Sequence, residues 1–170
     1  RDDAADAVSR LRSLGLQIEI LSGDAAQAVE ATASALGVSL WHARQSPEDK
    51  LAWVRQRQFE GHRVAMLGDG INDAPVLAGA NVSIALGGGA SMAHRAADLV
   101  LTAESLLRVP ELFALARRTR RIIRENLAWA LAYNLLALPF TALGWVTPWM
   151  AALGMACSSL LVTLNALRLS

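Results

Sequence analysis

The chain has 170 residues, a formal net charge of +1 and 54% hydrophobic residues. Its length would suit one ordinary domain with a sizeable core, but residues 127–167 contain no Asp, Glu, Lys, Arg or His. The net charge does not bear on a nucleic-acid partner, but no basic stripe interleaved with aromatic residues appears, and we expect no such partner. The single cysteine, Cys157, excludes an internal disulfide and a cysteine-based zinc site.

Composition divides the chain into stretches of different character. Residues 1–104 mix apolar and charged residues, 105–126 form a basic helical connection, and 127–146 and 149–167 are apolar. The chain opens on Arg1-Asp2-Asp3, without an initiator methionine, and runs directly into a helical pattern. We therefore expect it to be the C-terminal part of a longer protein, with other domains of the same polypeptide upstream.

In the first stretch, helical and strand patterns alternate. The apolar spacing from residue 4 to 14 and from 25 to 36 is helical, and Gly15 and Gly37 follow where each helix would end. Ser46 is placed to be the N-cap of a helix that starts at Pro47. Strands are predicted at 16–21, 38–43, 64–68 and 82–86. This alternation predicts an α/β fold, with βαβ units arranged around a parallel sheet.

An acidic loop follows the strand predicted at 64–68. Two glycines flank Asp69, Asn72 and Asp73 follow within one tight turn, and Pro75 suits a helix start. Asp69 therefore lies at the carboxyl end of a strand, where open α/β sheets bind ligands. Two carboxylates and an amide suit Mg²⁺, with Asp69 and Asp73 as its acids and Asn72 in support. The alternative is a polar turn in which Asp73 serves only as a helix N-cap.

Two further groups are predicted at the same edge of the sheet. Ser22 offers a hydroxyl, and the amides of Gly23 and Asp24 lie at a helix N-terminus, a natural anion site; the alternative is a plain N-cap by Ser22 or Asp24. Lys50 is the only lysine among 16 cationic residues. Its compact ammonium suits a phosphoryl oxygen, and the alternative is a solvated helix lysine. Together with Asp69, these groups form an arrangement for phosphoryl transfer.

The two apolar stretches predict a transmembrane hairpin. Residues 127–146 and 149–167 give 20 and 19 positions without a formal charge. Each is long enough to cross a hydrocarbon core of ~30 Å. A tight connection at 144–148 is flanked by tryptophans at interface depth. Arginines precede the first span and Arg168 follows the second, which places residues 1 to about 124 and the C-terminus in the cytoplasm.

Polar side chains inside a membrane span are costly, so those in the predicted spans indicate a function. A sulfur-bearing side chain lies on the same face as one of them. Tyr133 and Asn134 are adjacent in the first span, and Met155 and Ser159, four residues apart, share one face of the second. A thioether is a soft ligand that prefers Cu(I), and hydroxyl or amide oxygens can complete a transient site. From these residues alone, packing or lipid contact by Met155 is the alternative.

The sequence Gly-Asp-Gly-Ile-Asn-Asp-Ala-Pro at 68–75 resembles the hinge signature of the P-type ATPases, in the haloacid-dehalogenase superfamily. The resemblance implies a partial Rossmann-like phosphorylation domain with a parallel sheet. It implies that Ser22-Gly23-Asp24 is the phosphate-binding turn, where many members carry threonine, and that Lys50 steadies the phosphoryl group. Asp69 and Asp73 would then hold Mg²⁺, and ATP would be bound mainly by an upstream domain.

The two spans are similar to the last two membrane helices of copper-transporting P-type ATPases, through Tyr133-Asn134 and Met155-Ala156-Cys157-Ser158-Ser159. The resemblance implies that Tyr133, Asn134, Met155 and Ser159 hold Cu(I) during transport. It also implies a multi-pass pump in a bacterial plasma membrane, with a copper chaperone among its partners. Zinc and cadmium relatives place a lysine and an aspartate in these spans, and neither is present. The sequences at 75–77 and 165–168 further resemble pumps that supply copper for cytochrome oxidase assembly.

One catalytic element does not occur in this sequence. The family's Asp-Lys-Thr-Gly motif, which carries the nucleophilic aspartate, is missing, and so is its Thr-Gly-Glu motif. We therefore expect a Cu(I)-exporting pump whose nucleophile lies upstream, and no ATP hydrolysis by these 170 residues alone. The alternatives are a membrane-tethered phosphatase of the same superfamily and a non-catalytic, truncated assembly partner.

Overall fold

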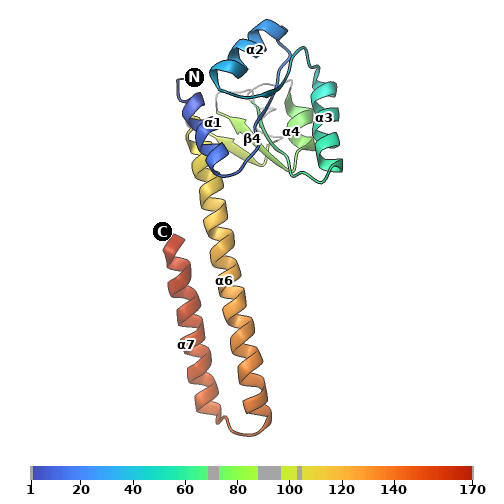
Figure 1. Cartoon of the computed structure of the whole chain (residues 1–170). Coiled ribbons are helices and arrows are strands. Elements are labelled where there is room, and N and C mark those ends of the chain that lie inside the picture. The colour runs from blue at the N-terminus through green and yellow to red at the C-terminus, as the bar shows by residue number, and fades with distance from the viewer. Residues whose placement is uncertain (1, 69–72, 88–96, 103–104, 170) are drawn as a thin grey trace. The chain divides into compact units, whose positions relative to one another are not determined.

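The structure is a computed structural model that describes residues 2–68, 73–87, 97–102 and 105–169. The chain divides into two compact units, Arg1–Glu111 and Leu112–Ser170. The first unit combines helices and strands, and the second consists of two long antiparallel helices joined by a short turn (Figure 1).

Helices and strands alternate along most of the first unit. Its elements are α1 (Ala4–Ser13), β1 (Glu19–Leu21), α2 (Ala26–Ala35), β2 (Leu40–His42), α3 (Pro47–Phe59), β3 (Ala65–Gly68), α4 (Ala74–Gly79), β4 (Val82–Leu86) and β5 (Leu99–Leu101). The pairs β1-β2, β3-β4 and β4-β5 are all parallel. The predicted α/β fold with parallel strands is confirmed. The described strands form two sheets, however, because no strand among them joins β1 to β3.

Local sequence signals set the helix ends of this unit. The Ser46 hydroxyl accepts a hydrogen bond from the Asp49 amide, and the Asp49 carboxylate accepts one from the Ser46 amide. This capping box begins α3 at Pro47, as predicted. Gly15 and Gly37 follow α1 and α2 with φ of 73° and 64°, a left-handed conformation that favours glycine. The strands β1 and β2 are shorter than the sequence pattern predicts.

Much of the hydrophobic core of the first unit lies where α4 covers the β3-β4-β5 sheet. Val76 and Leu77 of α4 and Ile84 and Ala85 of β4 are at most 2% exposed. Burial of each larger aliphatic side chain stabilises the fold by roughly 1.5–3 kcal/mol. Asp73, which directly precedes α4, is therefore attached to a well-packed helix.

The strand β5 was not predicted, and a side-chain contact between separate segments holds it. The buried Ser83 of β4 donates from its amide and its hydroxyl to the Asp98 carboxylate, at 2.9 Å in both cases. The Asp98 amide donates back to the Ser83 hydroxyl at 3.0 Å. Asp98 directly precedes Leu99, so this contact fixes the entry of β5 beside β4.

The second unit contains most of α6 (Arg108–Ala142), then α7 (Pro148–Ala166) and a short 3₁₀ helix, η2 (Leu167–Leu169). The segment Pro148–Leu169 is long and apolar enough to cross a membrane, with a mean hydropathy of 1.7 and none of it buried. Among the described helices it alone meets that criterion, so the predicted hairpin is only partly confirmed. The helix α6 ends at Ala142, four residues before the predicted end of its span, because Gly144 turns the chain with φ of 75°.

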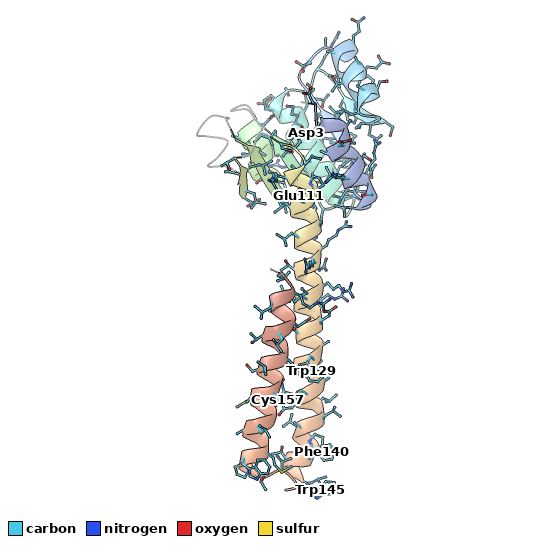
Figure 2. All side chains as sticks on the ribbon, turned by 90° about the vertical axis from the view of Figure 1, so that its left-hand side faces the viewer. Asp3, Glu111, Trp129, Phe140, Trp145 and Cys157 are labelled. Carbon is cyan, nitrogen blue, oxygen red and sulfur yellow. The ribbon has the colours of Figure 1, made fainter. Side chains whose placement is uncertain are left out.

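Small and polar residues line the contact between α6 and α7. Tyr133 lies directly against Gly154, where a Cβ atom would come within 2.5 Å of the Tyr133 hydroxyl. Trp129 Nε1 donates to Ser158 Oγ at 3.2 Å, and Asn165 Nδ2 donates to Asn126 Oδ1 at 2.8 Å. Figure 2 shows Trp129 on α6 and, on α7, the neighbouring Cys157. Close approach at small residues and hydrogen bonds between helices are typical of helix pairs in membranes.

The Asp98 contact gives a prediction about pH. Hydrogen bonds from the Ser83 amide and hydroxyl hold the pKa of Asp98 below its ordinary value of 3.8. Because the folded pKa is the lower one, the contact stabilises the fold fully above the ordinary pKa, and the stabilisation is lost as the pH falls through the folded value. We expect Asp98→Asn to lower hydrogen-exchange protection of the β4 amides near neutral pH, and to lower it less in acid.

The control is Asp6→Asn, which changes an exposed carboxylate that makes no hydrogen bond among the described residues. It should leave β4 protection unchanged at every pH. Equal protection in Asp98→Asn and the unmodified chain near neutral pH would show that the carboxylate does not hold β5 in place.

Candidate phosphate and metal sites

Three strand-to-helix connections carry the residues of the candidate phosphate site. Ser22, Gly23 and Asp24 lie between β1 and α2, Lys50 lies in the first turn of α3 after β2, and Asp73 immediately precedes α4. Because β1 and β2 are parallel neighbours, the first two connections leave the same edge of their sheet. Asp73 follows a strand of the other sheet, and its contact with Lys50 joins the connections after β2 and β3.

The ion pair between Lys50 and Asp73 is the central contact of this site. Lys50 Nζ donates to Asp73 Oδ1 at 2.8 Å, and the two side chains are only 14% and 15% exposed. A cation in the first turn of a helix faces the positive end of the helix dipole, so it needs a nearby anion. Asp73 supplies that anion, and partial burial limits screening by water. Lys50 is therefore not a solvated helix lysine.

Asp73 occupies the N-cap position of α4 without capping it. Its side chain makes no capping hydrogen bond to α4, which removes the interpretation of Asp73 as only a helix cap. A Cβ atom built on Gly68 would lie 3.2 Å from Asp73 Cβ and 3.3 Å from its Oδ2. Both distances are tighter than ordinary contacts, so glycine at 68 leaves room around the carboxylate oxygen that Lys50 does not bind.

The Ser22-Gly23-Asp24 turn is closed by its own side chains. The Ser22 hydroxyl donates to the Asp24 carboxylate at 2.9 Å, and the Asp24 amide donates to Ser22 Oγ at 3.3 Å. The N-cap residue of α2 is Ala25, so the alternative in which Ser22 or Asp24 caps this helix is wrong. The backbone also ties this turn to the connection after β2, because the Gln45 amide donates to the Ser22 carbonyl at 2.9 Å.

Arg44 is a residue of this site that the sequence analysis missed. Its amide donates to the Asp24 carbonyl at 2.9 Å, and its φ of 54° lies in a region that non-glycine residues seldom occupy. Such conformations persist where the surroundings fix them, and they cluster at functional sites. Nothing in the sequence signals it, because arginine has no preference for the left-handed conformation.

The donors described here suit Mg²⁺ in their chemistry. Asp73 offers a carboxylate oxygen beside the space at Gly68, and carboxylate oxygens are the ligands that Mg²⁺ prefers. Asp69 and Asn72, the other predicted ligands, lie outside the described residues. Within the described ranges no three His, Cys, Asp or Glu residues are grouped closely enough to hold a metal ion. The predicted magnesium set is therefore represented in the structure by Asp73 alone.

The residues predicted to hold copper lie on different sides of the helix pair. Tyr133 is half-buried and faces α7 at Gly154. Asn134, Met155 and Ser159 are exposed, and the Met155 side chain is exposed to 68%. Met155 and Ser159 lie one turn apart on α7. Within this unit, the thioether and the Ser159 hydroxyl therefore point to a surface that α6 does not cover.

The Lys50–Asp73 pair can be tested by a double-mutant cycle with Lys50→Gln and Asp73→Asn. Hydrogen bonds between charged, partly buried groups contribute about 1.5–3 kcal/mol, so each single variant should lower the free energy of unfolding and the two changes should not add. The measurement is chemical denaturation of the four proteins.

The control is the exposed pair formed by Arg108 and Glu111, whose side chains are 61% and 50% exposed at an N–O distance of 2.8 Å. The neutralising substitutions Arg108→Gln and Glu111→Gln should give a coupling energy below about 1 kcal/mol, as exposed ion pairs do. Equal coupling energies for the two pairs would mean that burial does not strengthen the Lys50–Asp73 contact.

Residues 1–81 match the haloacid dehalogenase-like hydrolase family. Over 99% of this chain, a cation-transporting P-type ATPase B of Mycobacterium bovis is 44% identical, and a copper-exporting P-type ATPase of Staphylococcus aureus is 40% identical. The chain spans 22% and 21% of the length of these two relatives.

Two solved structures are similar to this one. A crystal structure of a zinc-transporting PIB-type ATPase in its E2.Pi state matches 99% of this chain and 28% of its own, with 41% identity and a TM-score of 0.93. The catalytic domain of the CPx-ATPase CopB-B matches 66% of this chain and 44% of its own, with 35% identity and a TM-score of 0.63. The chain therefore belongs to the P-type ATPases of the haloacid-dehalogenase superfamily, as its hinge sequence at 68–75 predicts.

Proposed function

We propose that this chain is the C-terminal portion of an ATP-driven pump that exports Cu(I) through an aspartyl-phosphate intermediate. The Lys50–Asp73 ion pair carries the phosphoryl-transfer part of the proposal, because it brings a cation and a magnesium-type carboxylate together at 2.8 Å. Phosphoryl transfer depends mainly on positioning and on neutralising charge, and these residue types serve both purposes.

Each group has a separate role in this proposal. The Lys50 ammonium neutralises a phosphoryl oxygen, and the hydroxyl and amides of the Ser22-Gly23-Asp24 turn donate hydrogen bonds to others. The Ser22 hydroxyl and the Asp24 amide would do so in place of the hydrogen bonds that they make within the turn. Asp73 and Asp69 would hold Mg²⁺, with Asn72 in support, and the bound ion would neutralise the charge that develops on the phosphate. The ion pair holds the Lys50 and Asp73 side chains 2.8 Å apart.

The nucleophilic aspartate would come from an upstream segment of the same polypeptide. The division of the strands into two sheets supports this, because β1 and β3 each have an edge that pairs with no described strand. Strands of parallel sheets are normally buried on both faces, yet Leu67 of β3 is 39% exposed. We infer that an additional parallel strand lies between β1 and β3 in the whole protein and presents the nucleophile beside Lys50 and Asp73.

The choice of Cu(I) as the transported ion depends on individual residues. Overall similarity does not favour either metal, because the copper-exporting relative is 40% identical and the zinc-transporting structure is 41% identical. Met155 provides a thioether, a soft ligand that prefers Cu(I), on the same face as the Ser159 hydroxyl. No lysine or aspartate occurs in residues 127–167 to favour a divalent ion. Tyr133 and Asn134 would complete the site.

In the proposed topology, residues 1 to about 124 and the C-terminus face the cytoplasm of a bacterium. The arginines before the first span and Arg168 after the second support this through the positive-inside rule. A copper chaperone on that side would deliver the ion. The supply of copper for cytochrome oxidase assembly stays a prediction from the sequences at 75–77 and 165–168.

The proposal predicts that the purified chain of 170 residues does not hydrolyse ATP, because the nucleophile is missing. Phosphate release should stay at the background level with Mg²⁺ and Cu(I) present, whereas the full-length pump should release phosphate when Cu(I) is added. ATP hydrolysis by the short chain that is abolished by Asp73→Asn would contradict the assignment of an upstream nucleophile.

The copper assignment is tested by Met155→Val in the full-length pump. Loss of the thioether should reduce Cu(I)-stimulated turnover on the order of tenfold, the scale on which metal sites respond to altered ligand environments. Met150→Val is the matched control, because Met150 is another exposed methionine of α7 outside the predicted site. The assignment of Met155 as a copper ligand would be contradicted by equal Cu(I)-stimulated turnover in the two variants. It would also be contradicted if Zn²⁺, and not Cu(I), stimulated turnover of the unmodified pump.

A further inference from the structure

Four arginines form one continuous stripe on α6, which we name the arginine stripe: Arg117, Arg120, Arg121 and Arg124. Their spacing of three, four and seven residues places them on one face over two helical turns. All four side chains are exposed, and together with Glu125 and Ala128 they line an open groove of ≈ 550 Å³.

The arginine stripe lies on the side of α6 that faces away from α7. Contacts with α7 are made by Asn126, Trp129 and Tyr133, which are roughly half a turn from the stripe around the helix axis. Arg118, which lies outside the stripe, donates to the carbonyl of Arg168. The groove is therefore not filled by the second helix of this unit.

Most of the positive charge of the stripe is unpaired within the described residues. Arg121 pairs with Glu125 at 2.9 Å, and Glu125 also lies 3.5 Å from Arg168. Arg117, Arg120 and Arg124 make no ion pair or side-chain hydrogen bond within the described part of the chain. Three exposed guanidinium groups on one face are thus available to anions from outside this unit.

An apolar stripe continues the same face toward the C-terminal end of α6. Ala128, Leu131 and Leu135 follow Arg124 at helical spacing, and Arg117 and Leu135 are five full turns apart. Leu131 and Leu135 are 69% and 70% exposed. From Arg124 to Leu135 the helix rises about 16 Å, close to the thickness of one leaflet of a hydrocarbon core of about 30 Å.

We propose that this face of α6 binds an anionic phospholipid, with its phosphate on the arginine stripe and an acyl chain along Ala128, Leu131 and Leu135. Guanidinium groups bind phosphate oxygens through paired hydrogen bonds, which a zwitterionic headgroup would oppose with its own cation. Clusters of basic residues next to a membrane helix attract anionic lipids. The order of charged and apolar groups along the face matches the order of headgroup and chain in such a lipid.

The proposal rests on the proposed insertion of the α6–α7 hairpin in a membrane, and it is independent of which ion is transported or of ATP hydrolysis. The other occupants of the face would be membrane helices from the rest of the protein, or a free phosphate ion in the groove. A lipid with a charged head and an apolar chain uses both stripes, whereas free phosphate uses only the arginines.

The test is native mass spectrometry of the full-length protein in detergent, titrated with phosphatidylglycerol, phosphatidylcholine or inorganic phosphate. We expect phosphatidylglycerol to bind at least about tenfold more tightly than phosphatidylcholine, because each arginine near a lipid surface contributes substantially to attraction. Inorganic phosphate should not displace it. The variant Arg117→Gln/Arg120→Gln/Arg124→Gln should lose the preference and keep the circular dichroism spectrum of the unmodified protein.

The control is Arg10→Gln/Arg55→Gln/Arg63→Gln, which removes the same charge from exposed arginines of the first unit. It should retain the preference for phosphatidylglycerol. Unchanged preference in the stripe variant, no preference in the unmodified protein, or displacement of the lipid by inorganic phosphate would each overturn the proposal. None of these outcomes depends on transport, so a failure of the lipid site is distinguishable from a failure of the pump assignment.

Discussion

A lysine in the first turn of a helix faces the partial positive charge of the helix N-terminus, so a carboxylate beside it stabilises it. In this chain Asp73 satisfies Lys50 at 2.8 Å, with both side chains largely buried. The Asp73 side chain makes this contact and forms no capping hydrogen bond to its own helix, α4. The start of α4 therefore lacks a side-chain cap, whereas α3 keeps its capping box of Ser46 and Asp49. The connections after β2 and β3 meet at the charged pair.

Parallel strand order makes this meeting possible. In parallel sheets the strand-to-helix connections all leave at the carboxyl edge, so residues far apart in sequence converge there. Here the convergence joins two separate sheets, because Lys50 follows β2 of one sheet and Asp73 follows β3 of the other. Backbone bonds from Arg44 and Gln45 fix the Ser22 turn to the same edge. Polar groups from both sheets therefore meet at this edge.

The sequence was sufficient wherever a local signal determined the structure. The Ser46 cap, the glycines after α1 and α2 and the strand ending at Gly68 all follow from neighbouring residues. Contacts between distant segments could not be predicted in this way. The strand β5 has three residues and depends on the Asp98–Ser83 contact across 15 positions, and the left-handed Arg44 depends on its partners in the Ser22 turn. The Lys50–Asp73 ion pair could not be predicted without knowing that the connections after β2 and β3 are neighbours.

Contacts between distant segments also limited what the sequence could predict for the second unit. Absence of charge predicted where the apolar helices lie, but it could not assign their faces, because nearly every residue between 127 and 142 is apolar. The structure separates three faces of α6: one that packs on α7 through Trp129 and Tyr133, one that carries Asn134, and one that continues the arginine stripe. An apolar face that begins in unpaired arginines is costly to bury against another apolar helix, since the guanidinium groups would lose water without gaining partners. A lipid phosphate removes that cost, which is why the charge pattern favours lipid over protein on this side of the helix.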